Sequence, residues 1–202
     1  SGLIKHKVAY GTQNMAVGPA MTREQAETAI QAGMDIVSAE IEKGLDLVAI
    51  GEMGIGNTTP ATAITAVFTG LPAAQLTGRG TGVDDAGLAR KIAVMEKALA
   101  VNRPDASDAL DVLVKVGGLE IAGLAGVAIG AAARRVPVVI DGFISSAAAL
   151  LAAELVPAVK PYLIGSHESV EIGHQAVLRR LGIRPLFNLD LRLGEGTGAA
   201  LA

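Results

Sequence analysis

The sequence predicts an α/β fold, with a doubly wound, mostly parallel sheet that carries helices on both faces in a Rossmann-like three-layer arrangement. Short apolar runs without helical periodicity each precede a helix, as is typical of strands that are buried on both faces of a parallel sheet. Hydrophobic residues make up 50% of the 202 residues, and many of them are alanines, which favours closely packed helices. We expect residues 1–202 to form a single α/β core domain.

The first half of the chain alternates between helical and extended patterns. Thr22 and Gln25 have the spacing of a capping box, and Pro60 is tolerated because it falls in the first turn of a helix. A run without helical period ends in a glycine-rich segment, which indicates a strand and its loop. The expected elements are a helix over 22–43, a strand over 45–50, a loop over 51–57 and a helix over 58–70.

The same alternation continues in the second half, where acidic or hydroxyl residues mark several helix starts. Asp84 and Asp85 begin one helix, and Ser107 is expected to cap the next. The final residues read as the first turn of a helix that stops before it can bury a face, so we expect a truncated protein. The expected helices are 84–99, 107–116, 119–134, 145–155 and 174–181, and the expected strands are 136–140, 162–164 and 186–193.

Four of the expected strands end in glycine together with a polar or acidic residue. In parallel sheets, ligands bind beyond the carboxyl ends of the strands, so these side chains are expected to meet there. The candidate active site is therefore the ring of Glu52, Asp141, Ser169 and Glu195 with their neighbouring glycines.

These loops permit chemistry on a phosphorylated substrate, although each feature has a plainer interpretation. The segment Gly54–Thr59 joins a strand to a helix and suits a phosphate, or it serves only as a tight turn. Lys91 either reaches that phosphate or is solvated. Glu52 and Glu195 are each either a partly desolvated base or an acceptor at a helix end.

Composition excludes several other classes of function. The absence of cysteine excludes thiolate nucleophiles, thiolate metal sites and disulfides. A net charge of −3 with scattered basic residues and few aromatics argues against nucleic-acid binding. No apolar run is long enough to span a bilayer, so we expect a soluble, cytoplasmic protein without membrane contacts. The spacing of His167 and His174 does not indicate a shared metal ion, and each is interpreted as a surface or core histidine.

Several motifs in order resemble the nicotinate-nucleotide:dimethylbenzimidazole phosphoribosyltransferase family, which serves cobalamin lower-ligand synthesis. The resemblance covers essentially the whole chain and includes Gly11-Thr-Gln-Asn14 and Ala20-Met-Thr22. The motifs that carry it are Gly51-Glu-Met-Gly-Ile-Gly-Asn-Thr-Thr59, Gly78-Arg-Gly-Thr-Gly-Val-Asp-Asp85, Gly165-Ser-His-Glu-Ser169 and Arg192-Leu-Gly-Glu-Gly-Thr-Gly-Ala199.

The resemblance implies transfer of phosphoribose from nicotinate mononucleotide to dimethylbenzimidazole, with inversion at the anomeric carbon. It implies neither a metal nor a cofactor, and it implies a homodimer. Glu195 matches the position of the general base. The positions implied for substrate binding are Glu52, Gly54, Gly56, Asn57, Lys91, Asp141, Gly142, Ser169 and Gly194.

The family chain is longer than this one, with a smaller domain built from both flanks. We therefore expect this core to bind nucleotide but to catalyse poorly or not at all. Two alternatives remain open from the residues. One is a related transferase that uses another base, and the other is a non-catalytic nucleotide-binding or sensor module.

Overall fold

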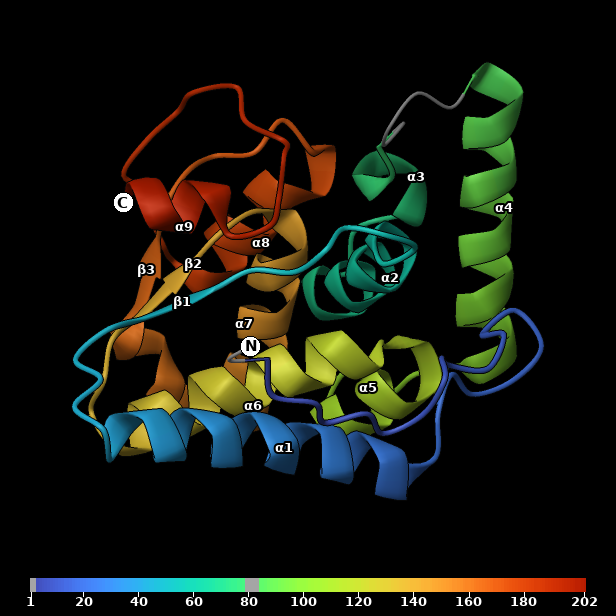
Figure 1. Ribbon diagram of the computed structural model, residues 1–202. Helices are drawn as coiled ribbons and strands as arrows, with labels where there is room; N and C mark the ends of the chain where they lie inside the picture. Colours follow the sequence, from blue (N-terminus) through green and yellow to red (C-terminus); the bar gives the residue numbers. More distant parts are fainter. Residues whose placement is uncertain (1–2, 79–83) are drawn as a thin grey trace.

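A computed structural model describes residues 3–78 and 84–202, so residues 79–83 of the glycine-rich motif 78–85 lie outside the described residues. A small parallel sheet lies among many helices (Figure 1), which confirms the predicted α/β class. The helices are α1 Arg23–Ile41, α2 Thr58–Thr69, α3 Ala73–Leu76, α4 Asp85–Asn102, α5 Ala109–Val116, α6 Leu119–Ala133, α7 Phe143–Leu155, α8 Ile172–Leu181 and α9 Thr197–Leu201, with a 3-10 turn η1 at Pro157–Tyr162.

The sheet that the structure describes has three parallel strands in the order β1-β2-β3. Their bounds are β1 Val48–Ile50, β2 Val138–Ile140 and β3 Leu163–Gly165. Val48 pairs with Val138, and Val138 pairs with Leu163, so the three carboxyl ends finish level at one edge. This edge is where the sequence predicted a ligand site.

The fourth expected strand, over 186–193, is wrong. Within the described residues, this segment forms only an isolated bridge between Phe187 and His167. Hydrogen bonds join Glu168 N to Phe187 O and Phe187 N to Ser166 O, but Asp190 then adopts a left-handed φ of 52°. A non-glycine residue in that region interrupts the pleat of a strand, so the segment passes the sheet edge as an irregular connection.

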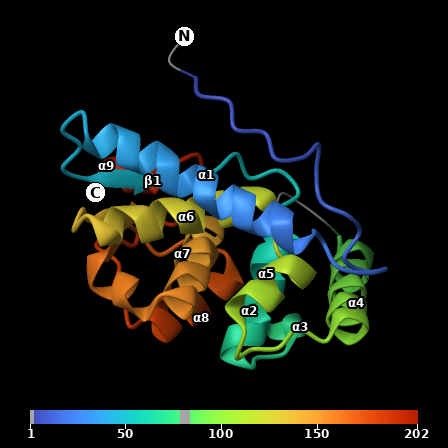
Figure 2. The same ribbon diagram turned by 90° about the horizontal axis from the view of Figure 1, so that it is seen from below.

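Helices α1 and α6 lie side by side and approach at their backbones (Figures 1 and 2). A Cβ built at Gly33 of α1 would lie 2.0 Å from Gly123 O, and one at Gly126 of α6 would lie 2.0 Å from Ile30 O. Only glycine permits such an approach, because any side chain would collide with the facing carbonyl. The alanine and glycine content of this region therefore serves the close helix packing that the composition predicted.

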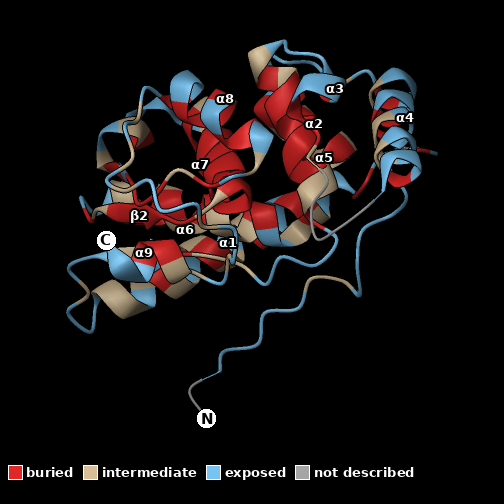
Figure 3. Ribbon diagram, turned by 90° about the horizontal axis from the view of Figure 1, so that it is seen from above, coloured by how far each residue is buried: buried red, intermediate tan, exposed pale blue. Residues whose placement is uncertain are grey.

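The centre of the molecule is α7, whose residues Phe143–Ala153 are all buried. Figure 3 shows it surrounded by other buried helical surfaces, and it packs against α2, α6 and α8. A helix that is apolar on every side belongs in the core. Because β2 ends at Ile140 and α7 begins at Phe143, these two buried elements fix the position of the two loop residues between them, Asp141 and Gly142.

The predicted helix starts are mostly confirmed. Thr22 and Gln25 form the capping box of α1, with both reciprocal hydrogen bonds present. Asp84 accepts a hydrogen bond from Gly87 N and caps α4. The assignment of Ser107 is wrong, since Asp108 caps α5 through Leu110 N and Asp111 N. Among the residues described, no helix combines the length and apolar character that crossing a membrane requires.

Both C-terminal histidines are buried, which is the core alternative of the sequence interpretation, and they lie on different elements. His167 follows β3, and His174 lies in α8, with their ring centroids 6.1 Å apart. Ser169 N donates to His174 Nδ1 at 2.8 Å, so Nε2 carries the proton and donates to Ser146 Oγ at 2.9 Å. His174 is therefore a neutral, fully paired core residue.

This burial predicts that the protein loses stability in mild acid. Desolvation, together with the nearby His167, lowers the pKa of His174 from 6.5 to about 3. The folded state then binds fewer protons than the unfolded state between those two values, so stability is lost as pH falls below 6.5. The expected contribution is about 2 kcal/mol between pH 7 and pH 5.

Denaturant unfolding at pH 7 and pH 5 checks this prediction. His174→Asn should lose about 2 kcal/mol less than the parent over this interval, whatever its absolute stability. His6→Asn is the matched control, because His6 is exposed, and it should follow the parent. Equal losses in the parent and His174→Asn would show that His174 does not titrate across unfolding.

Candidate active site

Three segments from distant parts of the sequence meet beyond the carboxyl ends of β1 and β2. Glu52 follows β1, Asp141 follows β2, and the loop 194–198 leads into α9. Glu195 N donates to Glu52 O at 3.0 Å, and Gly196 N donates to Asp141 Oδ2 at 3.0 Å. The structure thus brings together three members of the predicted ring.

Glu52 is the most constrained of these acids. Its Oε2 accepts hydrogen bonds from Gly54 N at 2.5 Å and from Asn57 Nδ2 at 2.6 Å. Desolvation raises its pKa, assisted by repulsion from Asp141 and Glu120 and opposed by the two hydrogen bonds. The prediction that a carboxylate at this strand end is partly desolvated is confirmed for Glu52.

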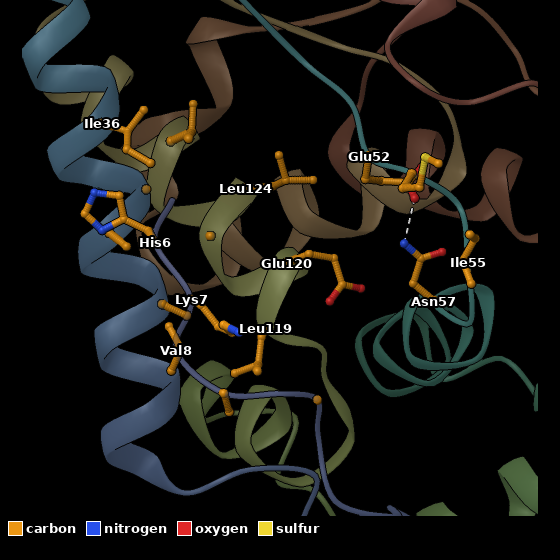
Figure 4. Close-up of a pocket in the computed structure, with 18 of the residues that line it drawn as sticks. His6, Lys7, Val8, Ile36, Glu52, Ile55, Asn57, Leu119, Glu120 and Leu124 are labelled. Carbon is orange, nitrogen blue, oxygen red and sulfur yellow. Dashed lines mark hydrogen bonds between the residues drawn. The ribbon is translucent and has the colours of Figure 1, made fainter. Parts of the chain in front are cut away.

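A cavity of about 650 Å³ opens beside Glu52 (Figure 4). Its apolar walls come from α1 and α6, and its far side is the N-terminal segment around His6 and Lys7. Glu52 and Glu120 are its two carboxylates, with Asn57 next to Glu52. A largely apolar pocket with a few convergent polar groups has the character of a small-molecule site.

The glycine loop after β1 exposes backbone at the start of α2. Gly54 and Gly56 have left-handed φ values of 81° and 73°, which explains glycine at both positions. Asn57 is buried, and its Oδ1 has no hydrogen-bond partner within the described residues. A 12-residue helix follows, so its positive end faces this loop. The arrangement suits an anionic or hydroxyl-bearing ligand.

Lys91 lies apart from the main cavity. It lines a separate hollow of about 280 Å³ together with Thr59 and Arg90, and its Nζ donates to Gly78 O at 3.4 Å. Thr59 belongs to the first turn of α2, so the hollow and the glycine loop flank the same helix start. Two cations facing that turn form a region of positive charge that suits phosphate.

Glu195 lies at the most unusual backbone position of the site. Its φ is 59°, and the flanking Gly194 and Gly196 are also left-handed at 73° and 76°. The side chain is exposed, and it accepts no hydrogen bond from the part of the chain that the structure describes. A strained, unpaired carboxylate beside the strand ends is a feature of functional sites more than of structural loops. The partial desolvation expected for Glu195 is not seen, because no described segment covers it.

A family model described as "Phosphoribosyltransferase" matches residues 1–202. The chain belongs to this phosphoribosyltransferase family. A curated nicotinate-nucleotide–dimethylbenzimidazole phosphoribosyltransferase from Roseiflexus sp. is 63% identical over 199 residues, covering 98% of this chain and 56% of that protein. The enzyme of the same name from Geobacter metallireducens is 60% identical over 201 residues, covering 100% of this chain and 57% of that protein.

A solved structure in this family has the same fold. The crystal structure of the enzyme so named from Thermus thermophilus matches with a TM-score of 0.92 at 46% identity, covering 100% of this chain and 59% of that chain. The resemblance inferred from the motifs is therefore confirmed. The chain spans little more than half the length of the curated relatives that it matches.

The structure places the remaining predicted site residues in different surroundings, and Asp141 and Ser169 do not hydrogen-bond to the side chains of the other acids in the predicted ring. Both carboxylate oxygens of Asp141 accept hydrogen bonds from the loop 194–198 and α9. Ser169 is buried, and its Oγ accepts from Glu171 N at 3.3 Å, without a described hydrogen bond to Glu52, Asp141 or Glu195. Gly142 is the N-cap of α7, and Gly194 would place a Cβ 3.5 Å from Glu52 Oε1.

The sequence interpretation missed Glu120 and the cavity itself. Glu120 lies in the first turn of α6 and reaches the space beside Glu52 (Figure 4). Two glycines precede that helix at 117–118, the same kind of signal that marked the other loops. The walls from α1 and the N-terminal segment gave no signal, because only tertiary packing brings them to the site.

Proposed function

We propose that this chain carries the transferase centre that moves phosphoribose from nicotinate mononucleotide to dimethylbenzimidazole, giving α-ribazole phosphate and nicotinate. The relatives that bear this name support the proposal at about 60% identity. The observation that carries it is the anchoring of the Glu195 loop directly on Glu52, beside a largely apolar cavity. That geometry holds the backbone of Glu195 against Glu52, which itself lines a pocket of a size that suits an aromatic base.

In this mechanism, Glu195 acts as the general base. Its carboxylate takes the N–H proton of the imidazole ring while the other ring nitrogen attacks the anomeric carbon of the donor. The bond from that carbon to nicotinate breaks on the opposite face, so the β-configured donor gives an α-configured product. The pyridinium of the donor takes up the electron pair of the broken bond and leaves as a neutral ring. The leaving group therefore needs no acid, and one base is enough.

The donor is proposed to bind along the glycine loop and the start of α2. Glu52, held by Gly54 and Asn57, is placed to accept hydrogen bonds from ribose hydroxyls. Lys91 and the amino end of α2 suit the phosphate. The family resemblance also implies substrate contacts at Gly56, Asp141, Gly142, Ser169 and Gly194, and of these we include Gly56, Gly142, Ser169 and Gly194 in the proposed donor site.

We also propose that residues 1–202 form one core domain that works as part of a homodimer. The support is apolar surface close to the site, where Met53, Ile55 and Leu193 are 69%, 80% and 66% exposed. Exposed apolar side chains that lie close together near a site favour cover from further protein. Size-exclusion chromatography with light scattering tests the dimer, and a monodisperse monomer would contradict it.

A second candidate is a nucleotide-binding module without catalysis, which the exposed position of Glu195 favours. A transferase with a different acceptor is a variant of the first proposal, because the acceptor is chosen by pocket walls. A transferase forms a ribosylated base from the donor and an acceptor, whereas a binding module binds the donor and forms no product.

Incubating the purified chain with nicotinate mononucleotide and dimethylbenzimidazole separates these candidates. We expect this core to form α-ribazole phosphate and nicotinate only slowly, and in equal amounts by chromatography. Benzimidazole, adenine and a phenol offered in parallel identify the preferred acceptor. Binding of nicotinate mononucleotide by calorimetry without product from any acceptor would support the binding module, and absence of binding would contradict both candidates.

A further inference from the structure

The carboxylate of Asp141 is occupied by backbone amides of the loop that carries Glu195 and of the first turn of α9, here together called the Glu195 loop. Its Oδ1 accepts from Gly198 N at 2.7 Å and from Ala199 N at 3.2 Å, and its Oδ2 accepts from Gly196 N at 3.0 Å. The Asp141 side chain is 1% exposed. A carboxylate with both oxygens engaged in this way has little capacity left for a ligand.

His167 supports this arrangement from the other side. Its Nδ1 lies 3.8 Å from Asp141 Oδ1 and 3.1 Å from Ser166 Oγ, and the ring is buried. A Cβ at Gly198 would lie 1.9 Å from His167 Nδ1 and 2.9 Å from Asp141 Oδ1. The loop backbone therefore rests directly on the imidazole ring, and only glycine fits between them.

The end of β1 completes the attachment. A Cβ at Gly51 would lie 2.3 Å from Gly196 N, so the two backbones are in contact. Glu195 N also donates to Glu52 O at 3.0 Å. The loop thus contacts residues that follow all three strands: Gly51 and Glu52, Asp141, and His167.

Little else in the described chain holds this loop in place. Its helix α9 has five residues, of which Gly198 and Ala199 are buried. A helix of that length is not stable by itself, and two small side chains contribute little apolar burial. Hydrogen bonds to a buried carboxylate are stronger than those between neutral groups, so Asp141 is the main local anchor.

We infer that Asp141, supported by His167, is a positioning residue that fixes the Glu195 loop against the strand ends, rather than a residue that contacts the donor. The inference deepens the proposed function, because the loop holds the proposed base. It replaces the ligand role that the sequence suggested for Asp141. The geometry of the clamp itself does not depend on which reaction the chain catalyses.

Amide hydrogen exchange followed residue by residue tests the clamp without any reaction. In Asp141→Asn, the amides of Gly196, Gly198 and Ala199 should exchange about 10- to 100-fold faster, while those of α1 and α6 keep their protection. Asp108→Asn is the matched control, since Asp108 accepts two backbone amides at the start of α5. Its effect should stay within α5. Unchanged exchange at the three loop amides would overturn the inference, and so would a uniform loss of protection across the chain.

Gly198→Ala provides a second variant that leaves Asp141 intact. Its methyl group would displace the loop from His167, so the same three amides should lose protection. If Asp141→Asn does not fold, this variant decides the matter, and full protection in it would overturn the inference.

A double-mutant cycle connects the clamp to the reaction. Asp141→Asn should lower kcat about 10- to 100-fold through misplacement of Glu195, with donor affinity retained. In a Glu195→Gln background the same change should have almost no further effect. An equal fall in kcat in both backgrounds would mean that Asp141 affects the reaction independently of Glu195, which would overturn the inference. If no variant or parent forms product while the exchange results hold, the proposed function fails and the clamp stands.

Discussion

Replacing Glu195 by glutamine is expected to lower transfer by about 10²- to 10⁴-fold, the usual contribution of a general base. Glutamine keeps the size of the side chain and the backbone hydrogen bond from residue 195 to Glu52, but it cannot take the imidazole proton. Glu195 is exposed, and its side chain forms no hydrogen bond or ion pair with the described residues, so the fold should not respond. The measurement is kcat for α-ribazole phosphate formation, together with donor binding by calorimetry.

Donor affinity in Glu195→Gln should stay within about threefold of the parent, because the proposed contacts to the ribose and phosphate come from Glu52, the start of α2 and Lys91, and not from the Glu195 side chain. Glu24→Gln is the matched control, an exposed acid in the first turn of α1 that should change neither quantity. Transfer at the parent rate by Glu195→Gln would remove the general-base role from Glu195. Loss of donor binding together with transfer would instead make it a binding residue.

The local signals in the sequence predicted much of the fold, because caps and glycine punctuation act over a few residues. The Thr22 capping box, the strand and glycine loop before α2 and the Asp84 cap all depend on neighbours in sequence. The strand predicted over 186–193 is wrong because an alternation of apolar and polar residues does not by itself reveal a partner strand, and Asp190 breaks the pleat. Strand pairing is a tertiary property.

The candidate site could be located from the sequence, but the roles of its members could not. Glycine and acid at successive strand ends predicted that Glu52, Asp141 and Glu195 would meet. The carboxylate of Asp141 accepts hydrogen bonds from amides that lie more than fifty residues further along the chain, and no local pattern in the sequence predicts such contacts. The cavity depends on α1 and the N-terminal segment, which have no pattern in common with the strand ends.

Gly126→Ala should cause the largest loss of stability among substitutions of a single glycine in α6. The new Cβ would lie 2.0 Å from Ile30 O, a backbone atom that cannot rotate away, so α1 and α6 must separate. The expected loss is about 3 kcal/mol or more, even though alanine favours the helix by up to about 1 kcal/mol. For a chain of this size, Tm should fall by roughly 6 to 12 °C.

Gly123→Ala is a matched control within the same helix and against the same partner. A Cβ there would lie 3.8 Å from Ala29 O, an ordinary contact, so helix propensity should decide the outcome. We expect this variant to be neutral or more stable by up to about 1 kcal/mol in thermal and denaturant unfolding. The two glycines are one turn apart, so opposite signs for the two alanines would isolate the backbone contact as the cause. If Gly126→Ala were as stable as Gly123→Ala, the close approach of α1 and α6 would be wrong, and with it the wall that these helices give to the cavity beside Glu52.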